Sequence, residues 1–142
     1  MQKTVLFIIT IIMSGINLKS QDYFQQKVDY IINVELNDKK HILIADITID
    51  YTNNSPDDLD IIWLHIWPNA YKDNSTALAK QKLSDGNLDL QNATQEERGY
   101  ISDLNFKVNN KQVDWKCHPD HIDICKIILN KPIRSGESIR IT

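Results

Sequence analysis

A chain of 142 residues with a formal charge of −3 is long enough for one domain with a real core, and it leaves little room for a second domain. Residues 1–20 carry Lys3 and Lys19 but no acidic residue, so the charge of the remainder is −5. This acidic balance argues against nucleic acid as a partner.

The first twenty residues have the three-part layout of a secretory signal peptide. A basic start precedes the apolar run 5–13, and a polar exit follows at 14–20. The run is shorter than the about 20 residues that cross a bilayer. We expect cleavage near Ser20 and an exported mature domain, 21–142, that is periplasmic or extracellular and has no membrane span. A buried N-terminal strand or helix is the alternative.

Two segments near the start of the mature chain alternate with the period of a β-strand. Segments 28–36 and 42–52 place apolar side chains on one face and mainly polar ones on the other, which is typical of half-buried strands. The polar cluster 37–40 between them predicts a turn. The two segments should therefore form an antiparallel hairpin.

The apolar centre of the chain is segment 61–67. One side of a strand would carry Ile62, Leu64 and Ile66, and the other Ile61, Trp63, His65 and Trp67. Because both faces are mainly apolar, we expect an interior strand that ends at Pro68, with its tryptophans and His65 in the core. If only one face is covered, the tryptophan face is exposed unless another domain or chain lies on it.

The second half of the chain predicts one helix and several strands. Segment 75–84 combines a polar cap candidate and good helix formers, and Asp85 and Gly86 follow as a stop. Segment 87–98 reads as a loop with at most one helical turn, at 94–98, and connections of this length are often functional. Strands are expected at 100–108, 111–115, 122–129 and 138–142, with turns at 109–110 and 118–121.

These elements define an all-β fold class, an antiparallel β-sandwich or a saddle-shaped sheet with one short helical excursion near 75–84. The sequence stops inside its last predicted strand, which would leave an open edge. We therefore expect residues 21–142 to be the front portion of a longer protein.

Cys117 and Cys125, with His118 and His121 between them, form the one cluster of potential metal ligands in the sequence. The spacing matches no usual structural zinc pattern. A disulfide suits an exported protein, but a two-residue hairpin loop at 119–120 would place the cysteines on opposite faces of the sheet. A register change of one residue would bring them to the same face. We favour two buried free thiols.

No motif for nucleophilic catalysis, phosphate binding or zinc hydrolysis is present: G-x-S-x-G, a glycine-rich phosphate loop and H-E-x-x-H are all missing. Acidic pairs at 57–58 and 96–97 lie in predicted loops and read as solvated surface. The sequence therefore predicts no catalytic, cofactor-binding or metal-ligating residue.

Four runs nevertheless resemble the opening part of an exported bacterial aminopeptidase. They are WPNAY at 67–71, ALAKQKL at 77–83, EERGYI at 96–101 and PIRSGESI at 132–139, and segment 23–30 is similar to the family's first strand. The family is the aminopeptidase N type of zinc metallopeptidases, within the gluzincins. The resemblance implies a saddle-shaped, all-β N-terminal domain that packs on a zinc-bearing catalytic domain of the same parent chain.

The resemblance also implies the function of the parent protein, which would hydrolyse amino-terminal residues of peptide substrates. The family's H-E-x-x-H, its third zinc ligand and its G-x-M-E-N strand have no counterpart here, so no residue carries over as catalytic. We expect the zinc in the catalytic domain and no activity in this chain alone.

A second hypothesis is an independent exported β-sandwich that binds a glycan or a protein, with Trp63 or Trp67 as an exposed platform. Such a binder should show its aromatic platform in a pocket. An accessory domain should instead show a broad apolar patch and an unpaired final strand.

Overall fold

The computed structural model describes residues 23–142, so the expected signal peptide lies outside the described part of the chain. The elements are β1 (Lys27–Asn37), β2 (Ile42–Thr52), β3 (Leu59–His65), the 3-10 helix η1 (Trp67–Tyr71), α2 (Ala77–Ser84), α3 (Asp89–Asn92), β4 (Lys107–Val108), β5 (Lys111–Gln112), β6 (Asp114–Cys117), β7 (Ile124–Ile133) and β8 (Ser138–Ile141).

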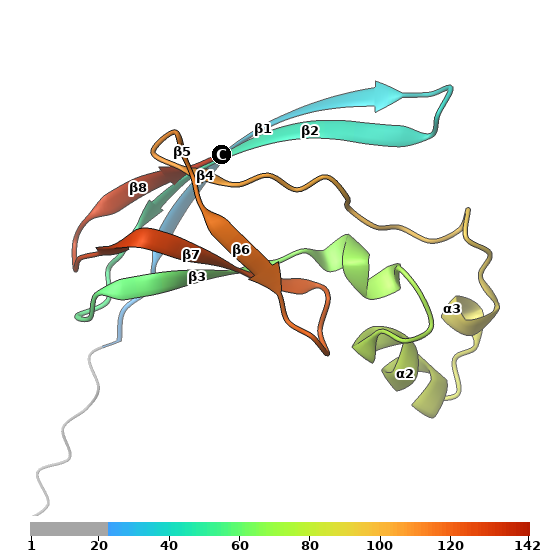
Figure 1. Ribbon diagram of the computed structural model, residues 1–142. Coiled ribbons are helices and arrows are strands. Elements are labelled where there is room, and N and C mark those ends of the chain that lie inside the picture. The colour runs from blue at the N-terminus through green and yellow to red at the C-terminus, as the bar shows by residue number, and fades with distance from the viewer. Residues whose placement is uncertain (1–22) are drawn as a thin grey trace, which may run out of the picture.

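The strands form two antiparallel sheets, which confirms the all-β fold class (Figure 1). The larger sheet has the order β1-β2-β8-β4-β5 and the smaller one β3-β7-β6. The chain passes between the sheets after β2, after β3, after β5 and after β7. Side chains from both sheets therefore meet in one sandwich-like core.

The core consists of alternate residues of β7 and β8 together with single residues of β3 and of the β5–β6 connection. Its buried members are Ile62, Val113, Ile127, Leu129, Ile133, Ile139 and Ile141, and Ile49, Tyr51, Leu64, Phe106, Val108 and Trp115 pack around them. Ile127, at the middle of the small sheet, has no exposed surface. The centre of the fold is therefore β7, which pairs with a strand on each side.

The prediction that segment 61–67 is an interior strand is wrong. Strand β3 pairs only with β7 and lies at the edge of the small sheet. Ile62 and Ile66 are buried as the alternation requires, but Trp63 is 54% exposed and Trp67 is 63% exposed. An apolar side chain can face outward when no second layer covers that face, and the local pattern cannot detect this.

The predicted antiparallel hairpin of the first two strands is confirmed, but the half-buried character predicted for both strands is wrong for the half next to the turn. The paired residues of β1 and β2 extend from Val28 opposite Tyr51 to Leu36 opposite Leu43, and residues 38–41 form the turn. The half next to the turn is exposed on both faces, because the small sheet does not reach it. In Figure 1 this half of β1 and β2 extends away from the rest of the fold. We call it the arm.

The helix and the turns follow from local chemistry. The Thr76 hydroxyl accepts a hydrogen bond from the Ala79 N–H at 3.1 Å and caps α2, and Gly86 adopts φ +79° just past its end. Asn109 and Asn110 take positive φ values of 49° and 65°, as a tight hairpin turn requires. These three expectations are confirmed.

Several expected strand limits are wrong. Of segment 100–108 only Lys107–Val108 is a strand, and the chain before it is extended but unpaired. At 94–98 the Glu97 and Arg98 N–H groups donate to the Thr94 and Gln95 carbonyls at 3.3 Å each, which makes a turn there but no helix, whereas η1 and α3 were not expected. Strand β8 lies between β2 and β4, so the final strand is paired on both sides rather than at an open edge.

Asn53 joins two of the places where the chain passes between the sheets, after β2 and after β7. Its side chain is fully buried, and its amide nitrogen donates to the carbonyl oxygens of Asp57 at 2.8 Å and Ile133 at 3.0 Å. Its side-chain oxygen accepts from Ser55 and Gln26. Its backbone N–H donates to the Glu137 carbonyl at 3.0 Å. One residue thus holds the start of β1, the β2–β3 connection and the β7–β8 connection together.

Replacing Asn53 with alanine should lower the free energy of unfolding by about 2–4 kcal/mol, because the Ile133 carbonyl would remain buried without its partner. Urea denaturation measures the change. The neighbouring control, Asn54→Ala, removes an exposed hydrogen bond and should cost less than about 1 kcal/mol. Equal losses in the two variants would show that the buried amide has no special role.

Candidate functional site

The most extensive unusual surface is one face of the arm. The apolar arm face consists of Tyr30, Ile32, Val34 and Leu36 of β1 and Leu43, Ala45 and Ile47 of β2. Ile32 lies opposite Ile47 and Leu36 opposite Leu43, with 56% of Ile32 and 68% of Leu43 exposed. No charged side chain lies on this face, because alternation sends the charged residues to the other side.

The opposite face of the arm is mixed. Ile31 and Ile44 are exposed there, but they alternate with Asn33, Glu35 and Asp46. This face can remain in water more readily than the apolar arm face, since polar groups separate its isoleucines. The two faces of the arm therefore differ in the kind of partner that they can accept.

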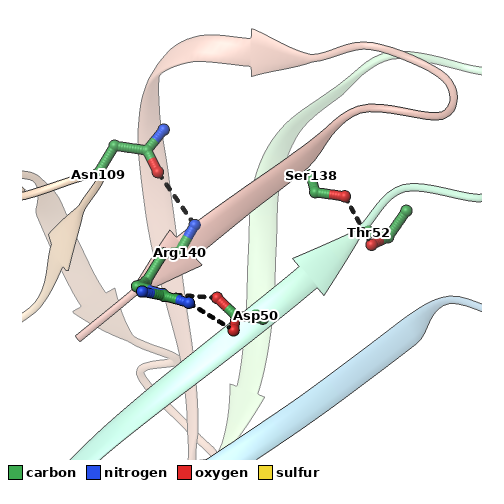
Figure 2. Close-up of polar contacts among 5 residues, drawn as sticks. All are labelled: Asp50, Thr52, Asn109, Ser138 and Arg140. Atoms are coloured by element: carbon green, nitrogen blue, oxygen red, sulfur yellow. Dashed lines mark hydrogen bonds and ion pairs between the residues drawn. The ribbon is translucent and has the colours of Figure 1, made fainter.

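A polar hollow lies on the same sheet where β1, β2 and β8 meet. It has a volume of about 550 Å³, and its lining includes Lys27, Asp29, Asp50, Thr52, Asn109, Asn110, Ser138 and Arg140. Figure 2 shows its hydrogen bonds. The Arg140 guanidinium donates to both carboxylate oxygens of Asp50 at 2.7 and 2.8 Å, and the hydroxyls of Thr52 and Ser138 lie 2.7 Å apart.

The charges in the polar hollow neutralise one another. The hydrogen bond from Arg140 lowers the pKa of Asp50 below its ordinary value, and the same pairing raises the pKa of Arg140. The pair therefore stabilises the fold at pH values above the ordinary pKa of an aspartate. This stabilisation is lost as the pH falls through the lowered pKa of Asp50. Lys27 lies 3.2 Å from Asp29. The arrangement holds β8 against β2 and presents no activated nucleophile.

The tryptophans form a separate surface on the edge of the small sheet. The Lys126 ammonium lies 5.5 Å from the centroid of the Trp63 ring, and the ring centroids of His65 and Trp67 are 4.1 Å apart. His65 Nδ1 is 3.8 Å from an Asp123 carboxylate oxygen, an ion pair when His65 is protonated. None of these residues lines the polar hollow.

The prediction of two free thiols is wrong, because Cys117 and Cys125 form a disulfide. The β6–β7 loop spans residues 118–123 rather than two residues, and its longer path places Cys117 directly opposite Cys125 on one face. The His118 and His121 rings lie 5.0 Å apart in this loop. Within residues 23–142, no three His, Cys, Asp or Glu side chains are grouped as metal ligands.

Three of the four runs that carry the family resemblance lie in the excursion between β3 and β4, and two of them are joined by hydrogen bonds there. Asn69 of WPNAY accepts a hydrogen bond from the Ile101 N–H at 2.7 Å, which joins the first run to EERGYI. Arg98 of that run donates to the Asn74 side chain at 2.7 Å and to the carbonyl oxygens of Leu90 and Ala93. Sequence reasoning missed the bonds from Ile101 to Asn69 and from Arg98 to Asn74, because their partners are 32 and 24 positions apart.

Comparisons with known proteins found no match among protein-family models, curated proteins or solved structures. Over the described range 23–142, no helix has the length and apolar character needed to cross a membrane.

Replacing both Cys117 and Cys125 with serine should lower the free energy of unfolding by about 2–3 kcal/mol, because the bond closes a short loop in the unfolded chain. Reduction of the native protein should lower its urea stability to that of the double variant. In denaturant without a reductant, a thiol titration should find no reactive cysteine. Two reactive thiols would instead support the original sequence prediction.

Proposed function

We propose that this chain is the non-catalytic N-terminal β domain of a zinc-dependent aminopeptidase of the aminopeptidase N type. The catalytic domain of the same parent chain packs on the apolar arm face. The parent protein is exported and hydrolyses amino-terminal residues of peptides, with its zinc in the catalytic domain. The present domain supports that domain and shapes its substrate cleft.

The apolar arm face is the observation that carries this proposal. Ile32, Val34, Leu36 and Leu43 are each more than half exposed and adjoin one another, and contiguous apolar surface of this kind is uncommon on soluble monomers. A hairpin with a neighbour on neither face is only marginally stable in water. A covering domain would remove both problems, and an uncharged face suits a stable internal contact because its burial desolvates no charge.

The resemblance supplies the family, and the positions of its runs support it. WPNAY, EERGYI and the segment around PIRSGESI form folded connections between strands, held by Asn69, Arg98 and Asn53. Such positions suit a scaffold, because these side chains satisfy backbone groups of the long connections and so fix their paths. The same positions give no support to a catalytic role for this chain.

An independent binder of a glycan or a protein is the second candidate. The exposure of Trp63 and Trp67 favours it, since aromatic rings are the usual platforms for sugars and peptides. Against it, Lys126 lies over the Trp63 ring and His65 lies against Trp67, so part of each ring is already in contact. The hypothesis of an independent binder also gives the apolar arm face no role.

If the proposal holds, the coding sequence continues in frame beyond Thr142 and encodes H-E-x-x-H. The pure 142-residue chain, supplied with zinc, should not hydrolyse amino-acid anilides. A stop codon at that point, or zinc-dependent turnover by the pure chain, contradicts the proposal. Saturable quenching of tryptophan fluorescence by a glycan would favour the second candidate.

Two neighbouring substitutions test which face of the arm is covered. Ile31 and Ile32 are 59% and 56% exposed but lie on opposite faces. In the isolated chain, Ile31→Asp and Ile32→Asp should each change the free energy of unfolding by less than about 1 kcal/mol. In the parent protein, calorimetry should show a markedly lower melting temperature for Ile32→Asp than for Ile31→Asp. Equal effects in the parent would exclude the apolar arm face as the domain contact.

A further inference from the structure

The outer edge of β1 is complementary to itself. We propose that two copies of this chain associate through this edge, with residues 27–35 of each β1 pairing antiparallel across a two-fold axis at Ile31. The larger sheets of the two copies then continue into each other. This inference concerns an edge of the arm rather than its apolar face, and it does not depend on the proposed function.

The direction of the backbone groups in β1 follows from the strand beside it. Asn53, just after β2, exchanges backbone hydrogen bonds with Gly136 and Glu137 on the side of β8. Because this direction alternates along a strand, the odd-numbered residues of β2 face β8 and the even-numbered ones bond to β1. Lys27 lies opposite Thr52, so the odd-numbered residues of β1 are the ones that bond to β2.

The even-numbered residues 28–36 therefore point their N–H and carbonyl groups away from β2. β1 is the first strand in the order of the larger sheet, and no strand of residues 23–142 pairs with its outer side (Figure 1). In a two-fold pair of β1 strands, these even-numbered groups bond to one another across the axis. The odd-numbered residues then form the closer pairs that share no hydrogen bond.

The edge lacks most of the devices that usually prevent strand addition. Its pairing with β2 is unbroken from residue 27 to residue 37, so no bulge distorts it. The same residues include no proline and no glycine. Tyr30, Ile31 and Ile32 are each more than half exposed, so both faces offer apolar side chains to a second strand. The charged side chains are the remaining obstacle, and their effect depends on the register.

Charge complementarity selects the two-fold axis at Ile31. In this register Lys27 of each copy lies opposite Glu35 of the second copy, and the two Ile31 side chains meet on the axis. An axis one residue later along β1 would instead place Asp29 opposite Glu35 of the second copy. Like charges directly opposite each other destabilise a sheet. Lys27 is available for the new pair, because its 3.2 Å ion pair with Asp29 is exposed and therefore weak.

The other face of the paired strands gains apolar contacts. Tyr30 lies opposite Ile32 of the second copy, and Val28 lies opposite Val34. The two apolar arm faces therefore join without a charge between them, and they stay open to the proposed domain contact. A single pair of strands makes a small interface, so we expect a weak and reversible dimer.

Charge reversal tests the register. Sedimentation equilibrium of the 142-residue chain from about 10 μM to about 1 mM should show monomer and dimer in equilibrium. Lys27→Glu and Glu35→Lys should each weaken dimerisation about tenfold, because both opposed pairs become like-charged. An equimolar mixture of the two variants should restore dimerisation, since the heterodimer has opposite charges in both pairs.

Three outcomes of this experiment overturn the proposal. They are a chain that stays monomeric up to about 1 mM, a dimer that neither variant weakens, and a mixture that dimerises no better than its components. Urea denaturation of each variant at low concentration verifies its fold. Restored dimerisation in the mixture also requires that both variants are folded.

Cysteine cross-linking locates the axis with two matched variants. Ile31 and Ile32 are 59% and 56% exposed, and both native cysteines are in the disulfide, so an introduced thiol has no native thiol to compete with it. Partners that share no hydrogen bond have Cα atoms about 4.5 Å apart, which suits a disulfide. Ile31→Cys should therefore form a covalent dimer in a glutathione redox buffer, as measured by a non-reducing gel.

Ile32→Cys should cross-link about tenfold more slowly than Ile31→Cys. The two copies of residue 32 lie diagonal to each other, about 7–8 Å apart and beyond easy disulfide reach. Equal rates would show that cross-linking follows random collision and overturn the proposal. Faster cross-linking of Ile32→Cys would also overturn it, because the copies would then meet in another register or through the apolar arm face.

Discussion

The buried amide of Asn53 is the interaction on which the rest of the structure depends. The two sheets are connected where the chain leaves β2 and where it leaves β7, and both connections bond to this one side chain. A carbonyl such as that of Ile133 must find a donor once the sheets close over it, because a buried, unpaired carbonyl is costly. The amide satisfies that need, and the backbone of the same residue, bonded to Glu137 and Gly136, aligns β2 with β8.

That alignment divides the larger sheet into two environments. Near Asn53, β2 has a strand on each side and a second sheet below it, so Ile49 and Tyr51 pack against the core. Farther along, the same alternation continues into the arm, where the small sheet no longer covers it. An apolar surface of this size without a cover is unusual for a self-contained domain. It is the physical basis for proposing a larger assembly, and the resemblance to aminopeptidases gives that assembly a family.

In the other two surfaces, the polar hollow and the tryptophan edge, the side chains contact one another. In the polar hollow, Arg140 and Asp50 satisfy each other, and the tryptophan edge is partly occupied by Lys126 and His65. Paired groups of this kind stabilise a fold without leaving reactive capacity. The surface that these contacts leave without a neighbour among the described residues is therefore the apolar arm face.

The sequence by itself determined the features that depend on near neighbours. Alternation identified the β1–β2 hairpin, a polar cap candidate and the stop at Asp85 and Gly86 predicted a short helix near α2, and Asn109 with Asn110 predicted a tight turn, because turn and cap chemistry acts within a few residues. The tertiary structure alone decided which apolar faces are covered and which residues meet. It placed Trp63 on an open edge and left Ile32 in the arm exposed, and the length of the β6–β7 loop paired Cys117 with Cys125. Burial and pairing depend on strands that are distant in the sequence, so no local pattern contains them.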